Sequence, residues 1–438
     1  MKKHKAHPLR VAKQVRREKV CVIGLGYVGF PLAVLCSAKG YEVFGYDKDE
    51  GKLARIERGE NIVNEEYLDK LIPKNKINII RDEKDFKKCD IFIIAVPTPV
   101  NEKYYPDLSF VVSAAETVAK NMKKGSLVVV ESTINPGVCE EIVQPVFEKE
   151  GYKIGKDVFI SHCPERINPG DPKWNVTNIP RVVGSFEKKG LEKALKFYRS
   201  IIDANIMPMK SIREAEAVKI TENSFRDINI AFVNELAKSF DLLGIDVVNV
   251  ICGASTKPFA FMAHWPSCGV GGHCIPVDPY YLIEKAKENN FDHKFLRVAR
   301  DINNSMPAYT VELLQEALNS IKKSIKGTRI GILGVSYKAD VGDLRESPAL
   351  KIIEFLRAKK ANLEIFDPYL HEFSTVKSAT ELLKKSQAVI VAANHSQFLN
   401  IPAVSFRKNG VRVIIDGKNC LDMEKIKKAG IVYRGIGR

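Results

Sequence analysis

KVCVIGLGYVGFPLAVLCSAKGYEVFGYD, residues 19–47, decides the fold, because it predicts a strand, a glycine-rich turn, a helix and a second strand in that order. The short apolar run 19–23 is typical of a buried strand. The apolar stretch 31–38 predicts a helix, and 42–46 predicts the second strand, which ends at Asp47. A strand, a helix and a second strand joined in this way indicate a parallel α/β sheet.

The turn Gly24-x-Gly26-x-x-Gly29 carries the chemistry of this unit. In a dinucleotide-binding turn the first glycine makes the turn, the second lets the backbone approach the pyrophosphate, and the third allows helix and strand to pack closely. The helix N-terminus supplies N–H donors to the phosphates. Asp47, about 20 residues on, would accept hydrogen bonds from the ribose hydroxyls and repel a 2′-phosphate, which favours NAD over NADP. Glycine-rich turns are common, but this one follows a strand and opens a helix, so it predicts bound NAD.

Two further strands are predicted at 91–96 and 127–130, and the segments that follow them contain Thr98 and Thr133. Strands that alternate with helices indicate a parallel, doubly wound sheet. Ligands of such sheets gather at the carboxyl ends of the strands, where both threonines are expected.

The pattern changes to helical periodicity over 211–320. From 214 to 243 apolar residues recur at spacings of three and four without Pro or Gly, which predicts a long helix. We expect this helix to link two domains and to offer a surface for dimer formation.

Toward the C-terminus the first pattern returns. Residues 329–334 repeat the strand and turn, 349–357 predict a helix, 363–366 predict a strand that ends at Asp367, and 388–393 predict a third strand. The chain therefore contains a second nucleotide-binding type of domain.

The second turn, Gly334-Val335-Ser336-Tyr337-Lys338, lacks the later glycines that close approach of a pyrophosphate needs, so we expect it to bind a different nucleotide. The predicted fold class is α/β: two Rossmann-like doubly wound domains joined by a central helical domain with a long helix. The predicted boundaries are 1–18 for a basic N-terminal extension, 19–210 for the NAD-binding domain, 211–320 for the central helical domain and 321–438 for the second Rossmann-like domain.

Composition narrows the functional classes. The net charge of +15 would suit a nucleic-acid binder, but Lys and Arg are interleaved with Asp and Glu along the whole chain and no stripe of base-stacking aromatics accompanies them. A solvated, charged surface is the preferred interpretation, and a salt-dependent DNA-binding assay would test the alternative. No run approaches the roughly 18 apolar residues of a membrane span. The N-terminus is basic without an apolar segment, which is not typical of a signal peptide. Nine scattered cysteines favour a reducing, cytoplasmic compartment.

The segment 269–279, GVGGHCIPVDP, places Cys274 after three glycines and before two prolines. Such a loop is expected to expose a thiol to substrate, although a free cysteine is often only a small core residue. Zinc binding by the nearby cysteines and histidines is an alternative that the spacings disfavour, since none is CxxC or HxxxH. We therefore expect no metal.

Lys219, Asn223 and Arg226 lie at i, i+4 and i+7 of the predicted long helix and therefore share one face. Together they could hold an anionic, hydroxyl-rich substrate. A solvated charged face is the plainer alternative, but Asn223 is a poor helix former with no cap to make in mid-helix.

These residues carry a resemblance to the UDP-glucose/GDP-mannose dehydrogenase family, from about Lys19 to Lys418. The stretches GHCIPVDPYY, residues 272–281, and TENSFRD, residues 221–227, resemble most the branch of the family that oxidises UDP-N-acetylhexosamines.

The resemblance implies an NAD-dependent, four-electron oxidation of the C6 hydroxyl of UDP-N-acetyl-D-mannosamine to UDP-N-acetyl-D-mannosaminuronate, through a thiohemiacetal and a thioester on Cys274. UDP-N-acetylglucosamine and UDP-glucose are the alternative substrates. It also implies a homodimer or homotetramer, a UDP-sugar site in the second Rossmann-like domain, no nucleic acid and no membrane.

The resemblance assigns roles to individual residues. The catalytic set is Cys274, Lys219, Asn223, Asp278, Glu165 and Thr133. The cofactor-binding set is Gly24, Gly26, Tyr27, Val28, Gly29, Asp47, Lys52, Thr98, Thr133 and Arg345. The substrate-binding set is Arg166, Ile167, Lys219, Asn223, Arg226, Lys257, Phe259, Gly271, Tyr337, Lys338 and Lys418.

The chain departs from the family pattern in three places. Ser267-Cys268 stands where the branch carries Gly-Pro, Lys257 is the one basic residue in a stretch that is more basic in relatives, and Lys418 stands where arginine is common. Two rival functions remain open: a nucleotide-sensing protein without chemistry, and an alcohol dehydrogenase that oxidises once. The number of NADH molecules formed per substrate separates them.

Overall fold

The computed structural model describes residues 18–63, 65–101, 105–167 and 173–438, so the predicted basic extension lies outside the described residues except for Glu18. The chain divides into two compact units, one that ends at Lys219 and one that begins at Ile220. Each unit contains its own sheet.

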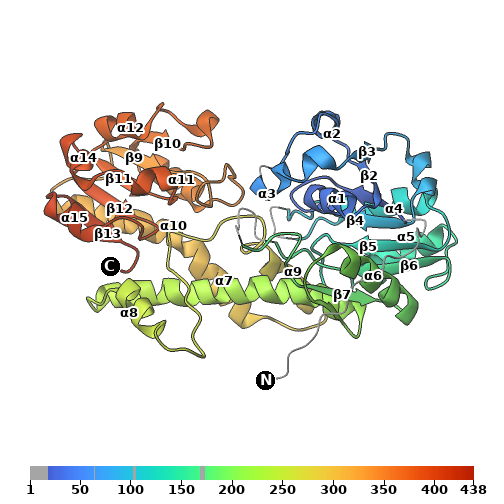
Figure 1. Ribbon diagram of the computed structural model, residues 1–438. Helices are drawn as coiled ribbons and strands as arrows, with labels where there is room; N and C mark the ends of the chain where they lie inside the picture. Colours follow the sequence, from blue (N-terminus) through green and yellow to red (C-terminus); the bar gives the residue numbers. More distant parts are fainter. Residues whose placement is uncertain (1–17, 64, 102–104, 168–172) are drawn as a thin grey trace, which may run out of the picture. The chain divides into compact units, whose positions relative to one another are not determined.

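The sheet of the first unit has eight strands in the order β3-β2-β1-β4-β5-β6-β7-β8 (Figure 1). The strands are β1 (Lys19–Ile23), β2 (Glu42–Tyr46), β3 (Ile77–Ile79), β4 (Ile91–Ile94), β5 (Ser126–Val130), β6 (Val158–His162), β7 (Arg181–Ser185) and β8 (Ile206–Pro208). The longer helices are α1 (Gly29–Ala38), α2 (Glu50–Glu57), α4 (Ser109–Asn121), α5 (Gln144–Lys149) and α6 (Lys188–Ile201). The order of the first five strands is that of a dinucleotide-binding fold.

The prediction of a doubly wound sheet is confirmed, with two corrections. The bounds of β1 and β2 are as predicted, but α1 begins two residues earlier, at Gly29. The sheet is not wholly parallel, because β7 runs antiparallel to β6. The strands β3, β6, β7 and β8 have no counterpart among the predicted ones.

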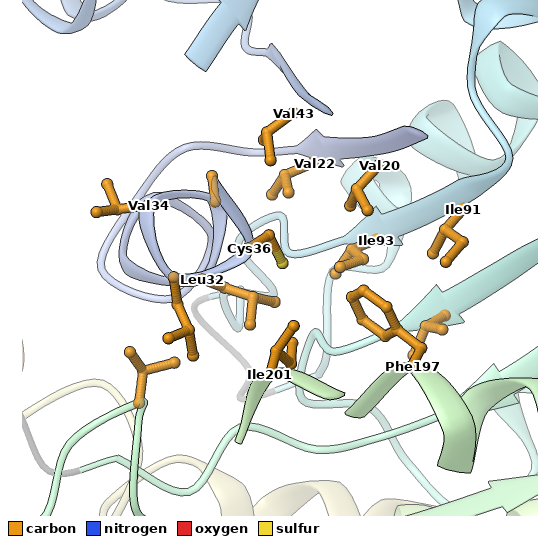
Figure 2. Close-up of a cluster of buried hydrophobic side chains, with 14 of the residues drawn as sticks. Val20, Val22, Leu32, Val34, Cys36, Val43, Ile91, Ile93, Phe197 and Ile201 are labelled. Atoms are coloured by element: carbon orange, nitrogen blue, oxygen red, sulfur yellow. The ribbon is translucent and has the colours of Figure 1, made fainter. Parts of the chain in front are cut away.

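Alternate residues of each strand face opposite cores, because side chains point to the two faces of a sheet in turn. Val20 and Val22 of β1 pack with residues of α1 and α6, among them Leu32 and Phe197 (Figure 2). Cys21 and Ile23 of β1 face the other side, where α4 and α5 cover the sheet. Burial on both faces explains why these strands are apolar at every position.

A helical region follows. The helix α7 (Ile212–Leu242) has 31 residues and runs from the first unit into the second, which confirms the predicted long helix to within two residues at each end. The other helices here are α8 (Val247–Ala254), α9 (Asp278–Glu288) and α10 (Lys294–Ser320).

The sheet of the second unit is wholly parallel, in the order β10-β9-β11-β12-β13. Its strands are β9 (Arg329–Leu333), β10 (Asn362–Phe366), β11 (Ala388–Val391), β12 (Val413–Asp416) and β13 (Val432–Gly435), and its helices are α11 (Pro348–Ala358), α12 (Ala379–Lys385), α13 (Ser396–Leu399), α14 (Ala403–Lys408) and α15 (Met423–Lys428). Apolar clusters lie on both faces. The molecule is thus mixed α/β, with two sheet domains and a central helical region.

Candidate functional site

The three glycines of the first turn have different surroundings. Gly24 has φ +88°, and a Cβ there would lie 2.6 Å from the carbonyl oxygen of Ala95. A Cβ on Gly29 would lie 1.9 Å from the carbonyl oxygen of Gly24. A Cβ on Gly26 would meet nothing within 4 Å. Packing therefore requires the first and third glycines, whereas the second borders open space at the start of α1, as a pyrophosphate site needs.

Asp47 lies at the carboxyl end of β2, beside this turn. Its Oδ2 accepts the backbone N–H of Leu25 at 2.8 Å and the Lys52 ammonium of α2 at 2.9 Å. Burial opposes the charged form, but the hydrogen bonds from Lys52, Leu25 and Asp49 outweigh it and lower the pKa of Asp47. The carboxylate is therefore charged at neutral pH and able to accept hydrogen bonds from ribose hydroxyls.

A cavity of about 340 Å³ opens at this point. It is lined by Leu25, Gly26, Tyr27, Asp49, Gly51, Lys52, Arg55, Ile62 and Val63. Val28 is the N-cap of α1, and Thr98 and Thr133 are half-buried beyond the ends of β4 and β5. The turn, the carboxylate and the cavity together fit NAD.

Glu165 is buried in the loop after β6. Its Oε1 accepts the backbone N–H groups of Arg166 and Ile167, at 2.5 and 2.7 Å, and its Oε2 pairs with Arg181. The Arg166 guanidinium donates to the carbonyl of Pro180 at 2.9 Å.

The loop that carries Cys274 packs against the turn after β9, within the second unit. A Cβ on Gly271 would lie 2.6 Å from Cβ of Tyr337, and one on Gly272 would lie 2.8 Å from the Tyr337 ring. The N–H of Gly272 donates to the carbonyl of Arg345 at 2.9 Å. Only glycine allows this approach, so the loop sequence sets the position of Cys274 relative to Tyr337.

Cys274 belongs to a group with Asn223 and Asp278. The Asn223 amide donates to Oδ2 of Asp278 at 2.5 Å, and both side chains are buried. Asp278 begins α9, and its N–H donates to the carbonyl of Cys274 at 2.8 Å. Cys274 itself is half-buried. The structure therefore joins the side chains of Asn223 and Asp278 and ties the backbone of Asp278 to that of Cys274.

Two predicted ligand-binding cations lie close to this loop. The hydrogen bond with Asp343 raises the pKa of Arg345, and the charges of Tyr337 and Cys274 raise it further. Lys418 follows Gly417, whose carbonyl accepts the N–H of Cys268 at 2.8 Å.

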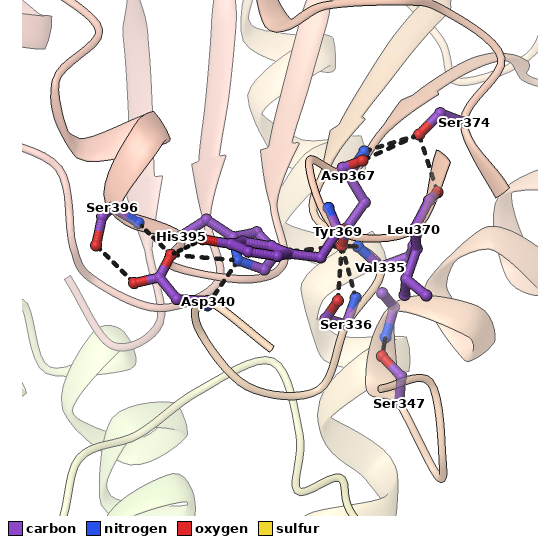
Figure 3. A network of polar contacts seen from close by, with 11 residues as sticks. Val335, Ser336, Asp340, Ser347, Asp367, Tyr369, Leu370, Ser374, His395 and Ser396 are labelled. Atoms are coloured by element: carbon purple, nitrogen blue, oxygen red, sulfur yellow. Dashed lines mark hydrogen bonds and ion pairs between the residues drawn. The ribbon is translucent and has the colours of Figure 1, made fainter. Parts of the chain in front are cut away.

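Asp367, which follows β10 beside the second turn, makes different hydrogen bonds from those of Asp47. Asp367 is fully buried, and its Oδ2 accepts the N–H groups of Val335 and Ser336, the Ser336 hydroxyl and Nε2 of His395 (Figure 3). Nδ1 of His395 accepts the N–H of Asp340, so the neutral ring carries its proton on Nε2. These internal bonds occupy the carboxylate and hold the turn that carries Tyr337.

Other predicted residues are not part of these groups. Lys219 is half-buried on α7, four residues before Asn223. Arg226, Lys257 and Phe259 are exposed, and Lys257 Nζ lies 4.8 Å from the centre of the Phe259 ring.

Two features of the structure bear on the metal and membrane alternatives. In the described part of the chain, no three His, Cys, Asp or Glu side chains gather as metal ligands would. None of the described helices is both long enough and apolar enough to span a bilayer.

Three domain models of the UDP-glucose/GDP-mannose dehydrogenase family match the chain: the NAD binding domain at residues 18–202, the central domain at 213–305 and the UDP binding domain at 331–423. The chain is 37% identical over 416 residues to the UDP-N-acetyl-D-glucosamine 6-dehydrogenase of Pseudomonas aeruginosa, covering 93% of this chain and 98% of that protein. It is 36% identical over 425 residues to the UDP-N-acetyl-D-mannosamine dehydrogenase of Pyrococcus horikoshii, covering 96% and 99%. A solved structure of UDP-D-ManNAc dehydrogenase from Pyrococcus horikoshii superposes with a TM-score of 0.89 at 35% identity, covering 96% of this chain and 99% of that one.

Proposed function

Because the chain belongs to the UDP-glucose/GDP-mannose dehydrogenase family, we propose that it oxidises C6 of UDP-N-acetyl-D-mannosamine twice, to UDP-N-acetyl-D-mannosaminuronate, with Cys274 as nucleophile. Membership of the family makes the chain an NAD-dependent oxidoreductase that acts on a UDP-sugar. The observation that carries the finer proposal is the group of Cys274, Asp278 and Asn223.

The covalent route explains how one site oxidises the same carbon twice. Bound NAD supplies the acceptor for the hydride that leaves C6 in each oxidation. The Cys274 thiolate adds to the aldehyde and forms a thiohemiacetal, and the second oxidation leaves a thioester. Water then releases the uronate and restores the thiol.

The neighbours of Cys274 have defined tasks in this scheme. The alkoxide that develops at C6 needs a fixed donor or cation, which Asn223 and Lys219 supply. The hydrogen bond between Asn223 and Asp278 orients both groups. Asp278, Glu165 and Asn223 assist with water and protons, as the family resemblance implies.

The remaining predicted residues bind the two ligands. We assign NAD to the first turn with Asp47 and Lys52, because the open space at Gly26 and the adjoining cavity suit it. We assign the UDP moiety to Tyr337, Lys338 and the other predicted substrate residues, since cationic donors pair well with phosphate oxygens. Asp367 is already hydrogen-bonded to Val335 and His395 and so is not available to ribose hydroxyls as Asp47 is. This difference supports a different nucleotide in the second domain.

NADH release measured side by side with UDP-ManNAc, UDP-GlcNAc and UDP-glucose tests the proposal. Two NADH per UDP-ManNAc, at the highest kcat/KM of the three, is the expected result. A preference for UDP-GlcNAc would mean that the chain performs the same two oxidations on the substrate named for the Pseudomonas relative. One NADH per substrate would indicate a simple alcohol dehydrogenase, and none would indicate a binding protein.

We further propose a homodimer or homotetramer in the cytoplasm, with the domain boundaries stated above. Exposed aromatic residues on α7, such as Phe232 at 53% exposure, support an interface on that helix. None of the nine cysteines, all of which lie in the described residues, is in a disulfide bond, which suits a reducing compartment.

A further inference from the structure

We propose that Arg181 and Glu131 are positioning residues that hold Glu165 in place and set the pH range in which Glu165 handles protons. The inference rests on the proposed role of Glu165 in the reaction. Glu131, Arg181 and Glu165 form one buried cluster in the first unit, which we call the Glu131–Arg181–Glu165 cluster.

The Arg181 guanidinium is shared between two carboxylates. Nη1 donates to Oε2 of Glu131 at 3.2 Å, and Nη2 pairs with Oε2 of Glu165. The side chains of Arg181 and Glu131 are 0% exposed and that of Glu165 is 6% exposed. The Tyr198 hydroxyl of α6 donates to Oε1 of Glu131. Oε1 of Glu165 accepts two backbone N–H groups, so every carboxylate oxygen of the cluster has a partner.

The direction of β7 brings Arg181 to this place. The antiparallel pair β6–β7 matches His162 with Gly184, and continuing that register by three residues sets Glu165 opposite Arg181. The first residue of β7 therefore lies at the carboxyl edge of the sheet. Glu131 lies at the same edge, directly after β5 and two residues before Thr133. Ligands of such sheets bind at this edge.

The charges of the cluster do not balance, because two carboxylates face one guanidinium. Burial raises the pKa of Glu131 to about 7; Arg181 opposes this rise and Glu165 adds to it. Two carboxylates that share a site titrate as a pair, and the charge of one makes ionisation of the other harder.

Besides the guanidinium of Arg166, whose backbone N–H donates to Glu165, the titratable groups that couple to the cluster are thiols and phenols, which are uncharged at neutral pH. They are Cys36 of α1, Tyr67 of α3 (Glu66–Asp69), Cys163 after β6 and Tyr198 of α6. Burial raises the pKa of each of them. After burial, the charges that most affect the pKa of Glu131 are therefore those of Arg181 and Glu165.

A buried ion pair is a weak source of stability, because desolvation offsets the attraction between the charges. A role in the reaction accounts better for three charged side chains at the ligand edge. Glu131 and Glu165 share the positive charge of Arg181, so the ionisation of Glu131 changes how strongly Arg181 attracts Glu165. Arg181 also fixes the direction of the Glu165 carboxylate.

The test compares Glu131→Gln, Glu165→Gln and the wild-type enzyme, with NAD and the UDP-sugar that the NADH assay selects. Glu131→Gln keeps the shape but removes the carboxyl group whose pKa is raised to about 7, so an acid limb of the kcat/KM profile that reflects ionisation of Glu131 should move to lower pH. Arg181→Met should lower kcat by about 100-fold with little change in the Kd for NAD, and Arg181→Lys should recover part of the loss.

The control is Glu192→Gln, which makes the same charge change on the exposed side of α6 and should leave the profile unchanged. An unshifted profile in Glu131→Gln, with kcat falling only as far as the melting temperature does, would overturn the inference while leaving the role of Glu165 intact. Full activity of Glu165→Gln would overturn both. If Arg181→Met does not fold, the shift in Glu131→Gln decides the question.

Discussion

Cys274 is half-buried in a loop whose glycines allow contact with Tyr337, and its carbonyl caps the first turn of α9. Replacement of the thiol by hydrogen removes the proposed nucleophile and leaves Gly24, Gly26 and Asp47 of the cofactor turn unchanged. We expect Cys274→Ala to abolish uronate formation and to leave the Kd for NAD nearly unchanged. Product analysis and calorimetric titration with NAD measure the two effects.

Cys252 offers a matched control, because it is an exposed free cysteine on α8. Cys252→Ala should keep both NADH equivalents. Full uronate production by Cys274→Ala would rule out the covalent route.

Asp367 gives the second unit a pH dependence. Burial opposes its charged form, but hydrogen bonds from His395 and from backbone N–H groups outweigh burial and lower the pKa of Asp367. Its contribution to stability is therefore present above the pKa of an unfolded aspartate, about 3.9, and is lost as the pH falls toward the lowered value. Asp367→Asn should reduce the free energy of unfolding by about 1–3 kcal/mol at neutral pH.

Denaturant unfolding over a range of pH measures this effect. The difference between Asp367→Asn and the wild type should shrink as the pH falls below about 4. Asp203→Asn is the control, because Asp203 is an exposed partner of Lys39 and should change stability by less than about 1 kcal/mol. A difference that stays constant down to about pH 3 would contradict the account.

At the scale of elements, the turn between β1 and α1 contains one glycine that packing requires and another that borders the proposed NAD site. Gly29→Ala should prevent the helix from closing on the strand, because its Cβ would lie 1.9 Å from a backbone oxygen. Gly26→Ala should keep the wild-type melting temperature, because its Cβ meets nothing, but should weaken NAD binding by about tenfold or more. Thermal melts with and without NAD distinguish the two. Wild-type NAD affinity in Gly26→Ala would show that the pyrophosphate does not lie there.

At the scale of the whole molecule, α7 is the element that we expect to meet a second copy. Phe225 and Phe232 are seven residues apart, on one face of the helix, and are 47% and 53% exposed. Phe232→Glu should shift the enzyme toward monomer by raising the dissociation constant about 30-fold, as loss of an interface aromatic does. Light scattering after size-exclusion chromatography gives the mass.

Val404 is the control for this substitution, because it is an exposed apolar residue of α14 with 56% exposure. Val404→Glu should not change the mass. An unchanged mass for Phe232→Glu would place the interface elsewhere or indicate a monomer.

Local pattern was sufficient for the fold class, although six of the thirteen described strands (β3, β6, β7, β8, β12 and β13) were not predicted. The strand, turn, helix and strand of residues 19–47 were predicted with small errors, because apolar period and glycine positions act within a few residues. The same holds for α7, whose apolar spacing is continuous. The family and NAD also followed from short motifs. The proximity of Cys274 and Asp278 could be predicted, because they are four positions apart at the start of one helix.

The sequence by itself therefore determined the fold class, the family and the cofactor, and it proposed the residues that bear the chemistry. Tertiary structure alone decided what surrounds those residues. The antiparallel direction of β7 pairs Arg181 with Glu165. The fold of the second turn places Asp367 in a hydrogen bond with His395, whereas Asp47 is half-buried beside a cavity. An arginine that opens the apolar run of β7 was the one signal of a buried charge. The physical reason is range: propensity and periodicity act locally, whereas burial, and with it charge pairing and proton affinity, depends on segments distant in the chain.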